Sequence, residues 1–179
     1  MSRRRKSQST ITVERVASKD LWLVAQGLDH KCFPCPVWLT TKEWQWYDPY
    51  LIFLEGAAVG FAAIRPDSNL SLERDRFFAS PDTVYLGRIG IVPLFRGRGL
   101  ASRFLEWLID WGKRNQYSRI TCNSAEANHG SRRLLKKFRF QSIGSVVCSP
   151  LRPEAPPLRI IIWERPLTAA SSLSRALSG

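Results

Sequence analysis

The sequence has 179 residues, of which 44% are hydrophobic, and its 27 Lys and Arg residues exceed its 15 Asp and Glu residues. This hydrophobic content excludes an intrinsically disordered chain, and the length is typical of one compact domain with a substantial core. The longest apolar stretch, Ala57 to Ile64, has eight residues, far fewer than the roughly 20 that cross a bilayer. Between Arg96 and Arg139 the net charge is +8. This segment is therefore either a solvated surface or the contact face for an anionic partner.

The predicted elements begin after a basic, polar arm over residues 1–10. Alternating β-branched residues predict a strand over residues 11–16, and the apolar spacing that follows Asp20 predicts a capped helix. A turn-rich stretch with two prolines follows over residues 30–37, before a second short helical pattern over residues 40–46. Two apolar runs, at residues 50–55 and 58–64, predict a hairpin because Gly56 lies in the short segment between them.

The second half of the chain alternates between strand and helix patterns. A polar loop over residues 66–82 leads to a strand at residues 83–92, whose two internal glycines indicate a bulge or a close backbone approach. Further segments are a helix at 100–113, a strand at 119–122, a helix at 130–137 and strands at 140–147 and 158–163. The sequence predicts an α/β fold with a mixed sheet, in one domain over residues 11–166 with a flexible tail over 167–179.

The most informative segment runs from Val92 to Ser102, where a strand ends at a proline and a glycine-rich basic turn opens a helix. Free N–H groups at a helix start, together with the helix dipole, favour an anion. Glycines allow a diphosphate to approach the backbone, and two arginines add charge. Neither the P-loop pattern nor the dinucleotide-binding fingerprint is present.

In its wider context, this segment resembles the GNAT acyltransferase superfamily. Arg96, Gly99 and Ala101 match the family motif Arg/Gln-x-x-Gly-x-Gly/Ala, which lies at the pyrophosphate of acetyl-CoA. The resemblance implies the GNAT fold, acetyl-CoA as cofactor and N-acetyltransferase activity. It also implies that the backbone of Ile89, Gly90 and Ile91 runs along the pantetheine arm of the cofactor. The pyrophosphate would be held at Arg96, Gly97, Arg98, Gly99, Leu100, Ala101 and Ser102.

Catalytic residues are less evident from the sequence. The resemblance implies that the amide of Ile91 stabilises an oxyanion and that Asn128 bonds the cofactor arm, although Asn128 is also a suitable helix N-cap. In the family, the general acid is a Tyr seven residues after the Asn. Leu135 occupies that position in this sequence, and Arg139 occupies the position of a family glycine. A thiolate leaves without a protein donor more readily than an alkoxide, so activity does not require that Tyr.

Two residues are candidates for the general base. Glu126 is the carboxylate nearest in sequence to the loop before Asn128, and its alternative role is a surface charge. Tyr85 lies on the strand that carries the motif, and its alternative role is packing. Some family members have Glu at the position that Asn123 occupies here. A further alternative is that water removes the proton of the amine, which needs neither Glu126 nor Tyr85.

Other groups carry weaker signals. The pair Cys32 and Cys35, with His30 nearby, lacks the further ligands of a zinc site, so we predict no metal. The four cysteines are too few for a disulfide scaffold, and the N-terminus lacks a secretory signal, which together favour free thiols and a cytoplasmic protein. Aromatic residues lie where the family binds its acceptor, and they serve either the core or that pocket: Trp38, Trp44, Trp46, Tyr47 and Tyr50.

The leading hypothesis is an N-acetyltransferase that acts by direct attack of an amine on acetyl-CoA in a ternary complex. Leu86, Gly87 and Arg88 also resemble the toxin branch of the family, which acetylates aminoacyl-tRNA. A third alternative is a catalytically silent GNAT fold that binds CoA or nucleic acid through its basic face. The acceptor, whether small molecule, peptide or aminoacyl-tRNA, stays open, as does the choice between monomer and homodimer.

Overall fold

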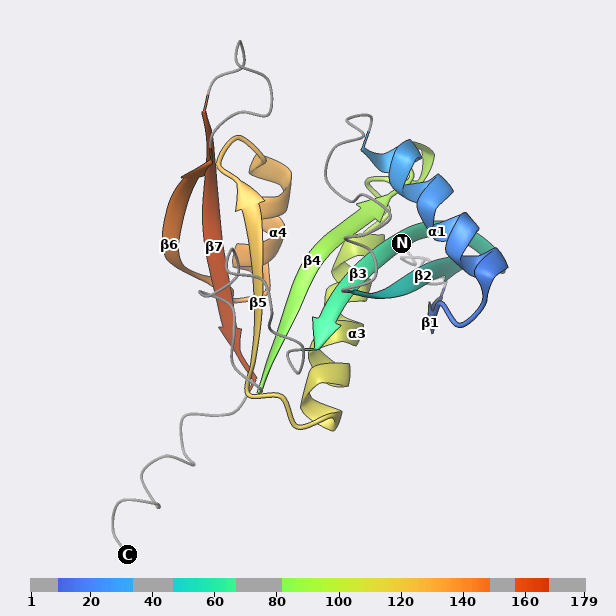
Figure 1. Ribbon diagram of the computed structural model, residues 1–179, viewed down its shortest axis with the longest axis horizontal. Coiled ribbons are helices and arrows are strands. Elements are labelled where there is room, and N and C mark those ends of the chain that lie inside the picture. Colours follow the sequence, from blue (N-terminus) through green and yellow to red (C-terminus); the bar gives the residue numbers. More distant parts are fainter. Residues whose placement is uncertain (1–9, 34–46, 67–81, 149–156, 168–179) are drawn as a thin grey trace, which may run out of the picture. The chain divides into compact units, whose positions relative to one another are not determined.

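The computed structural model describes residues 10–33, 47–66, 82–148 and 157–167 (Figure 1). Several predicted segments lie outside these ranges: the arm, the short helix at 40–46, most of the loop at 66–82, and the C-terminal tail. Cys35 and the tryptophans at 38, 44 and 46 lie outside them as well.

The described elements form an α/β chain with a mixed sheet, as predicted. Seven strands are hydrogen-bonded in the order β1-β2-β3-β4-β5-β7-β6. In chain order the elements are β1 (Ile11–Arg15), α1 (Lys19–Cys32), β2 (Asp48–Leu54), β3 (Ala57–Pro66), β4 (Thr83–Ile91), the short 3-10 helix η2 (Pro93–Phe95), α3 (Leu100–Arg114), β5 (Arg119–Ala125), α4 (His129–Lys137), β6 (Gln141–Cys148) and β7 (Leu158–Pro166). None of the described helices is long and apolar enough to cross a membrane.

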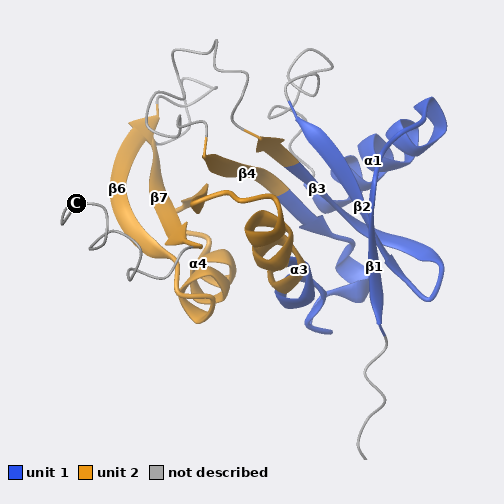
Figure 2. Ribbon diagram, turned by 90° about the horizontal axis from the view of Figure 1, so that it is seen from below, with its two compact units in different colours: residues 1–63, 89–104 blue, residues 64–88, 105–179 orange. Residues whose placement is uncertain are grey.

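The chain divides into two compact units, shown in Figure 2. Unit 1 comprises residues 1–63 and 89–104, and unit 2 comprises residues 64–88 and 105–179. The glycine-rich turn therefore belongs to unit 1, and the segment from Glu126 to Arg139 belongs to unit 2. The predicted single domain over residues 11–166 stays a prediction.

Unit 1 is built on the predicted hairpin of β2 and β3. Glu55 and Gly56 form its two-residue turn with φ of 53° and 80°, and positive φ at both positions is what a type I′ hairpin turn requires. β1 pairs antiparallel with β2, from Ile11 opposite Leu54 to Arg15 opposite Tyr50. The turn chemistry in the sequence was therefore sufficient to predict this hairpin.

Helix α1 packs its buried face on this hairpin. Ala25, Leu28 and Cys32 form a core cluster with Leu51, Phe61 and Ala63. The predicted cap at Asp20 is wrong, because the side chain of Ser18 accepts the hydrogen bond from the Leu21 N–H at 3.3 Å. Asp20 instead lies in the first turn, where a carboxylate favours the helix dipole.

Unit 2 combines one parallel strand pair with antiparallel pairs. β4 runs parallel to β5 from Thr83 opposite Arg119 to Leu86 opposite Cys122, where the registered pairs end. β5 and β7 pair antiparallel as far as Ala125 opposite Ile160. This partner explains why β5 extends three residues beyond the strand predicted from its own pattern. β6 pairs with β7 and has an irregularity between Ser142 and Gly144.

Candidate functional site

The glycine-rich turn in unit 1 connects η2 to the start of α3. Gly97 and Gly99 have φ of 77° and 76°, in the left-handed region that favours glycine. A Cβ built on either residue meets no atom within 4 Å. Both glycines are therefore required by backbone conformation, and the space beside them is open to a ligand.

Six consecutive backbone N–H groups, from Gly97 to Ser102, are left without hydrogen-bond partners in the described part of the chain. The first backbone bond of the helix start is donated by Arg103 to the Gly99 carbonyl at 3.1 Å. The free groups lie at the positive end of the helix dipole, where anions bind. The free N–H groups and the open space beside Gly97 and Gly99 suit a phosphate or diphosphate group.

Arg96 supports this turn with its side chain. Its Nε donates to the Ile91 carbonyl at 3.0 Å, and its Nη2 donates to the Cys32 carbonyl at 3.1 Å. Arg98 lies with its guanidinium 5.2 Å from the centre of the Phe95 ring and is exposed to solvent. Arg96 therefore connects the turn to β4 and to the end of α1, while Arg98 supplies charge at the surface.

Gly90 lies at a close backbone approach, the second of the two roles that its pattern indicated. A Cβ at Gly90 would lie 2.6 Å from Cε1 of Phe61 and 2.8 Å from Cβ of Cys32. Opposite it, a Cβ at Gly60 would lie 2.6 Å from the Gly90 carbonyl oxygen. Because Gly60 and Gly90 have no side chains, the end of β4 that carries Ile89 and Ile91 can pack closely against its neighbours.

In unit 2, Tyr85 is the centre of a polar cluster. Its side chain is buried, and its hydroxyl oxygen accepts a hydrogen bond from Nδ2 of Asn123 at 2.8 Å. Tyr85 lies opposite Thr121 in the register, so Asn123, two residues further along β5, faces the same side of the sheet. The guanidinium of Arg65 lies 5.2 Å from the Tyr85 ring centre.

Arg65 is a residue that the sequence analysis missed. It is only 3% exposed, which is rare for an arginine. In the sequence, Arg65 is visible only as a charged residue at the end of the apolar run in β3. No pattern in the sequence indicated that it lies next to Tyr85. The structure therefore adds a buried cation to the environment of a predicted catalytic residue.

Glu126 lies on the surface of unit 2. Its carboxylate is 3.7 Å from Nε of Arg159, and its side chain is about half exposed. Its carbonyl accepts a hydrogen bond from Nη1 of Arg132 at 2.9 Å. These contacts fit the alternative role of Glu126 as a surface charge.

Asn128 is the N-cap of α4. Its side-chain oxygen accepts from the Ser131 N–H at 3.0 Å, while its Nδ2 donates to no group in the described ranges. Leu135, at the position of the family's Tyr, is buried. Arg139, at the position of the family's glycine, has φ of 60°.

The remaining predicted aromatic residues that are described lie in or against the core. Tyr50 is buried, and Tyr47 packs against the α1 cluster. Cys32, Cys122 and Cys148 are free thiols. Within the described ranges, no group of three or more His, Cys, Asp or Glu side chains is arranged to hold a metal ion.

Comparisons with known proteins agree with this architecture. Crystal structures with similar folds include the ribosomal-protein-S18-alanine N-acetyltransferase from Escherichia coli, with a TM-score of 0.69, 16% identity and coverage of 91% of this chain and 97% of that chain. An N-acetyltransferase from Staphylococcus aureus Mu50 has a TM-score of 0.66 and 20% identity, covering 89% of this chain and 100% of its own. A GNAT family acetyltransferase from Elizabethkingia anophelis with acetyl-CoA bound has a TM-score of 0.68 and 14% identity, covering 90% and 99%.

At these identities the structural likeness shows the fold, which is the predicted GNAT fold. No curated protein sequence matches the chain. The model of the acetyltransferase (GNAT) family matches residues 22–140, a segment that contains the glycine-rich turn, Tyr85 and Asn128. Since this match covers more than half of the sequence, the chain belongs to the acetyltransferase (GNAT) family.

Proposed function

We propose that this chain transfers the acetyl group of acetyl-CoA, the co-substrate of its family, to an amine by direct attack in a ternary complex. The observation that carries the proposal is the set of free N–H groups from Gly97 to Ser102 at the start of α3. Together with the open space at Gly97 and Gly99, they fit the pyrophosphate of the donor. Membership of an acetyltransferase family favours this enzyme over a catalytically silent binding module.

The residues of unit 1 would bind the donor through their backbone. The turn would hold the pyrophosphate, and the strand end at Ile89, Gly90 and Ile91 would lie along the pantetheine arm. Arg96 supports the turn through its hydrogen bonds to the Ile91 and Cys32 carbonyls. In unit 2, the Nδ2 of Asn128 is the group available to the cofactor arm, since the side-chain oxygen caps α4.

The reaction needs one proton removed and one supplied. The amine nitrogen forms a bond to the acetyl carbon as the carbon–sulfur bond breaks, the amine loses a proton, and the departing thiolate gains one. The N–H of Ile91 would donate to the acetyl oxygen as negative charge develops there. An aliphatic amine is largely protonated at neutral pH, so a group that accepts its proton accelerates the reaction.

The local environment of Tyr85 suits this proton transfer better than that of Glu126. Asn123 donates to the Tyr85 oxygen, so the phenol proton is directed to another acceptor. Tyr85 would accept the amine's proton as a phenolate and pass it to the departing thiolate, and the Arg65 guanidinium at the ring face favours the negative charge of that phenolate. The Glu126 carboxylate, in contrast, is exposed and paired with Arg159, and this pairing competes with proton transfer.

The first experiment measures binding of acetyl-CoA by calorimetry to the wild type and to Gly99→Glu. The variant places a carboxylate where the diphosphate is proposed to bind, and we expect it to abolish binding. Gly27→Glu is the matched control, because Gly27 is exposed on α1 with no atom within 4 Å of its Cβ position. A folded wild type that does not bind acetyl-CoA would overturn the proposal.

The second experiment measures CoA release with a panel of amines: a peptide with a free N-terminus, a blocked peptide with one Lys, spermidine and an aminoacyl-tRNA. With the acceptor that reacts, Tyr85→Phe should lower kcat by about 100-fold, the lower range for acid–base catalysis. Glu126→Gln should change it by less than about threefold, since an exposed ion pair contributes little. The reverse order would assign the proton transfer to Glu126.

A further inference from the structure

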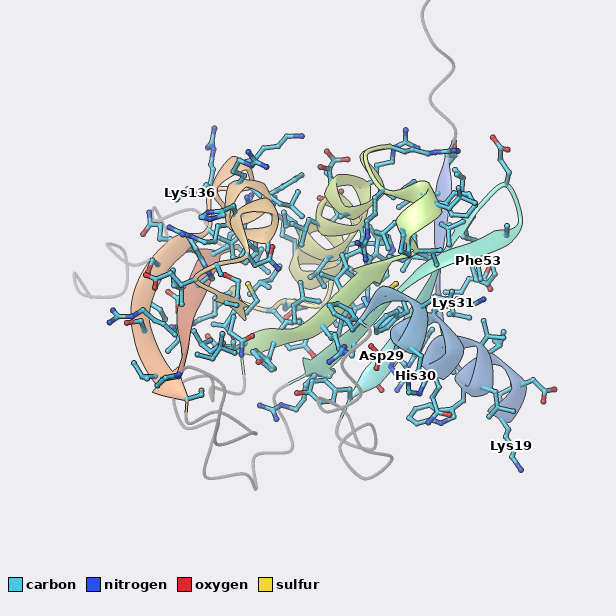
Figure 3. All side chains as sticks on the ribbon, turned by 90° about the horizontal axis from the view of Figure 1, so that it is seen from above. Lys19, Asp29, His30, Lys31, Phe53 and Lys136 are labelled. Atoms are coloured by element: carbon cyan, nitrogen blue, oxygen red, sulfur yellow. The ribbon has the colours of Figure 1, made fainter. Side chains whose placement is uncertain are left out.

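A group of basic side chains on α4 lies outside the turn that carries the proposed function. Its members are exposed and are here named the α4 basic surface: Arg133, Lys136, Lys137 and Arg139. Figure 3 shows Lys136 on α4. Arg133 precedes the two lysines by three and four positions, so these three side chains share one face of the helix. No Asp or Glu occurs between Ala127 and Cys148.

The charges of this surface are not neutralised by the described residues. Arg133, Lys136 and Arg139 form no side-chain ion pair or hydrogen bond within the described ranges. Other cations of unit 2 do, since Arg119 pairs with Glu164 and Arg159 with Glu126. The helix dipole accounts for lysines in the last turn of α4, but it does not account for Arg133 or Arg139.

Arg139 occupies a position where glycine is more stable. The Phe140 N–H donates to the Leu135 carbonyl and the Arg139 N–H donates to the Lys136 carbonyl, both at 3.0 Å. This pair of bonds ends a helix with a left-handed residue, usually glycine. Arg139 adopts that conformation with φ of 60°, which is unfavourable for a residue with a Cβ. This unfavourable conformation of an exposed arginine motivates the hypothesis that its charge has a function.

A second arginine next to Arg139 increases the unfavourable charge. Arg165 on β7 donates from Nη1 to the Phe138 carbonyl, and its buried Nε has no hydrogen-bond partner among the described residues. Burial and the nearby charge of Arg139 lower the pKa of the Arg165 guanidinium below its usual value. A bound anion would offset this repulsion.

We propose that the α4 basic surface binds the phosphodiester backbone of a nucleic acid strand. A nucleic-acid interface is polar and strongly positive, whereas protein interfaces are depleted in lysine and enriched in aromatic anchors. The exposed large apolar side chains in the described ranges lie on other elements than α4. This surface shares no residue with the acetyl-CoA turn, so either proposal can fail without the other.

The test measures binding of a fluorescent 20-nucleotide single-stranded RNA, and of DNA of the same sequence, between 50 and 200 mM salt. Four phosphate contacts predict an affinity loss of about 50-fold over this range, and each contact removed reduces the slope by about 0.7. Arg139→Gly should weaken binding about fivefold at 50 mM salt and raise the melting temperature, because it also relieves the strained φ. A loss of binding in a more stable variant is not a folding defect. Equal binding of RNA and DNA identifies the backbone as the shared ligand.

Further controls and competitors make the result specific. Lys19→Gln removes the same charge from α1, where Lys19 is exposed (Figure 3), and should leave affinity within twofold. Saturating CoA should also leave RNA binding unchanged, because the turn and the α4 basic surface share no residue. The proposal is overturned if Arg139→Gly and Arg133→Gln/Lys136→Gln bind RNA as the wild type does. It is also overturned if CoA displaces the RNA, or if poly-glutamate or anionic lipid vesicles compete as effectively as RNA.

Discussion

Arg96 donates from Nη2 to the carbonyl of Cys32 at 3.1 Å, and the two residues are 64 positions apart in the chain. Cys32 is the last residue of α1, where carbonyl groups lack partners within the helix. The same guanidinium also donates from Nε to the Ile91 carbonyl. One side chain therefore joins the end of α1, the end of β4 and the glycine-rich turn within unit 1.

Arg96→Lys should separate this structural role from charge alone. Lysine keeps the charge but lacks the planar fork that reaches two carbonyls at once, so we expect a loss of about 1–2 kcal/mol in unfolding free energy. The affinity for acetyl-CoA should fall as well. Urea unfolding and calorimetry measure the two effects. Arg98→Lys is the control, and equal stability of the two variants would argue against the bridging role.

Gly97→Ala should be destabilising although its Cβ meets no atom. An alanine at φ of 77° has an unfavourable left-handed backbone, so we expect a loss of about 1–2 kcal/mol. Gly27→Ala also enters open space, but in helical backbone, and should gain about 0.8–1 kcal/mol. Opposite signs in denaturant unfolding are expected, and a neutral Gly97→Ala would contradict the conformational requirement.

Gly60→Ala tests the close approach beneath the end of β4. Its Cβ would lie 2.6 Å from the Gly90 carbonyl oxygen and 2.7 Å from Cδ1 of Ile91. We expect a loss of about 1–3 kcal/mol from overpacking, with weaker acetyl-CoA binding because the Gly90 backbone must move. A Cβ at Gly144 would lie 3.9 Å from Cδ1 of Ile162, an ordinary contact, so Gly144→Ala should change stability by less than about 0.5 kcal/mol.

Cys122 makes stability depend on pH in the alkaline range. Burial raises the pKa of its thiol above the ordinary value, so the unfolded chain ionises first as the pH passes about 8.5. Stability from this thiol is complete below that pH and is lost above it. Between pH 8.5 and 9.5 the wild type should lose about 1 kcal/mol more than Cys122→Ala. Urea midpoints at these pH values measure it, and parallel profiles would show that Cys122 ionises equally in both states.

The accuracy of the sequence predictions depended on the range of the interactions. The helix predicted at 100–113 is Leu100–Arg114, and the hairpin turn at Gly56 was found, because periodicity and turn chemistry are local. Helix α1 extends to Cys32, beyond the predicted start of the turn at His30, since its last turn packs on Phe61 and Ala63.

The features of the candidate site divide in the same way between local and long-range interactions. The glycine-rich turn could be predicted because its residues are consecutive in the sequence. In the structure, Gly97 and Gly99 have the left-handed conformation that leaves the backbone N–H groups free for an anion. The contacts of Arg96 with Cys32 and of Arg65 with Tyr85 join segments whose spacing in sequence carries no pattern. These contacts had to be read from the structure.

The left-handed glycines and the Arg96 bridge also fix when the turn becomes ordered. Because the turn is held by bonds within unit 1, its conformational entropy is lost on folding, and little remains to be lost when a ligand arrives. In the free protein its six N–H groups lack intramolecular acceptors in the described ranges. Their amide hydrogens should therefore exchange rapidly with water although the backbone is rigid, so rapid exchange here reports solvation and not motion.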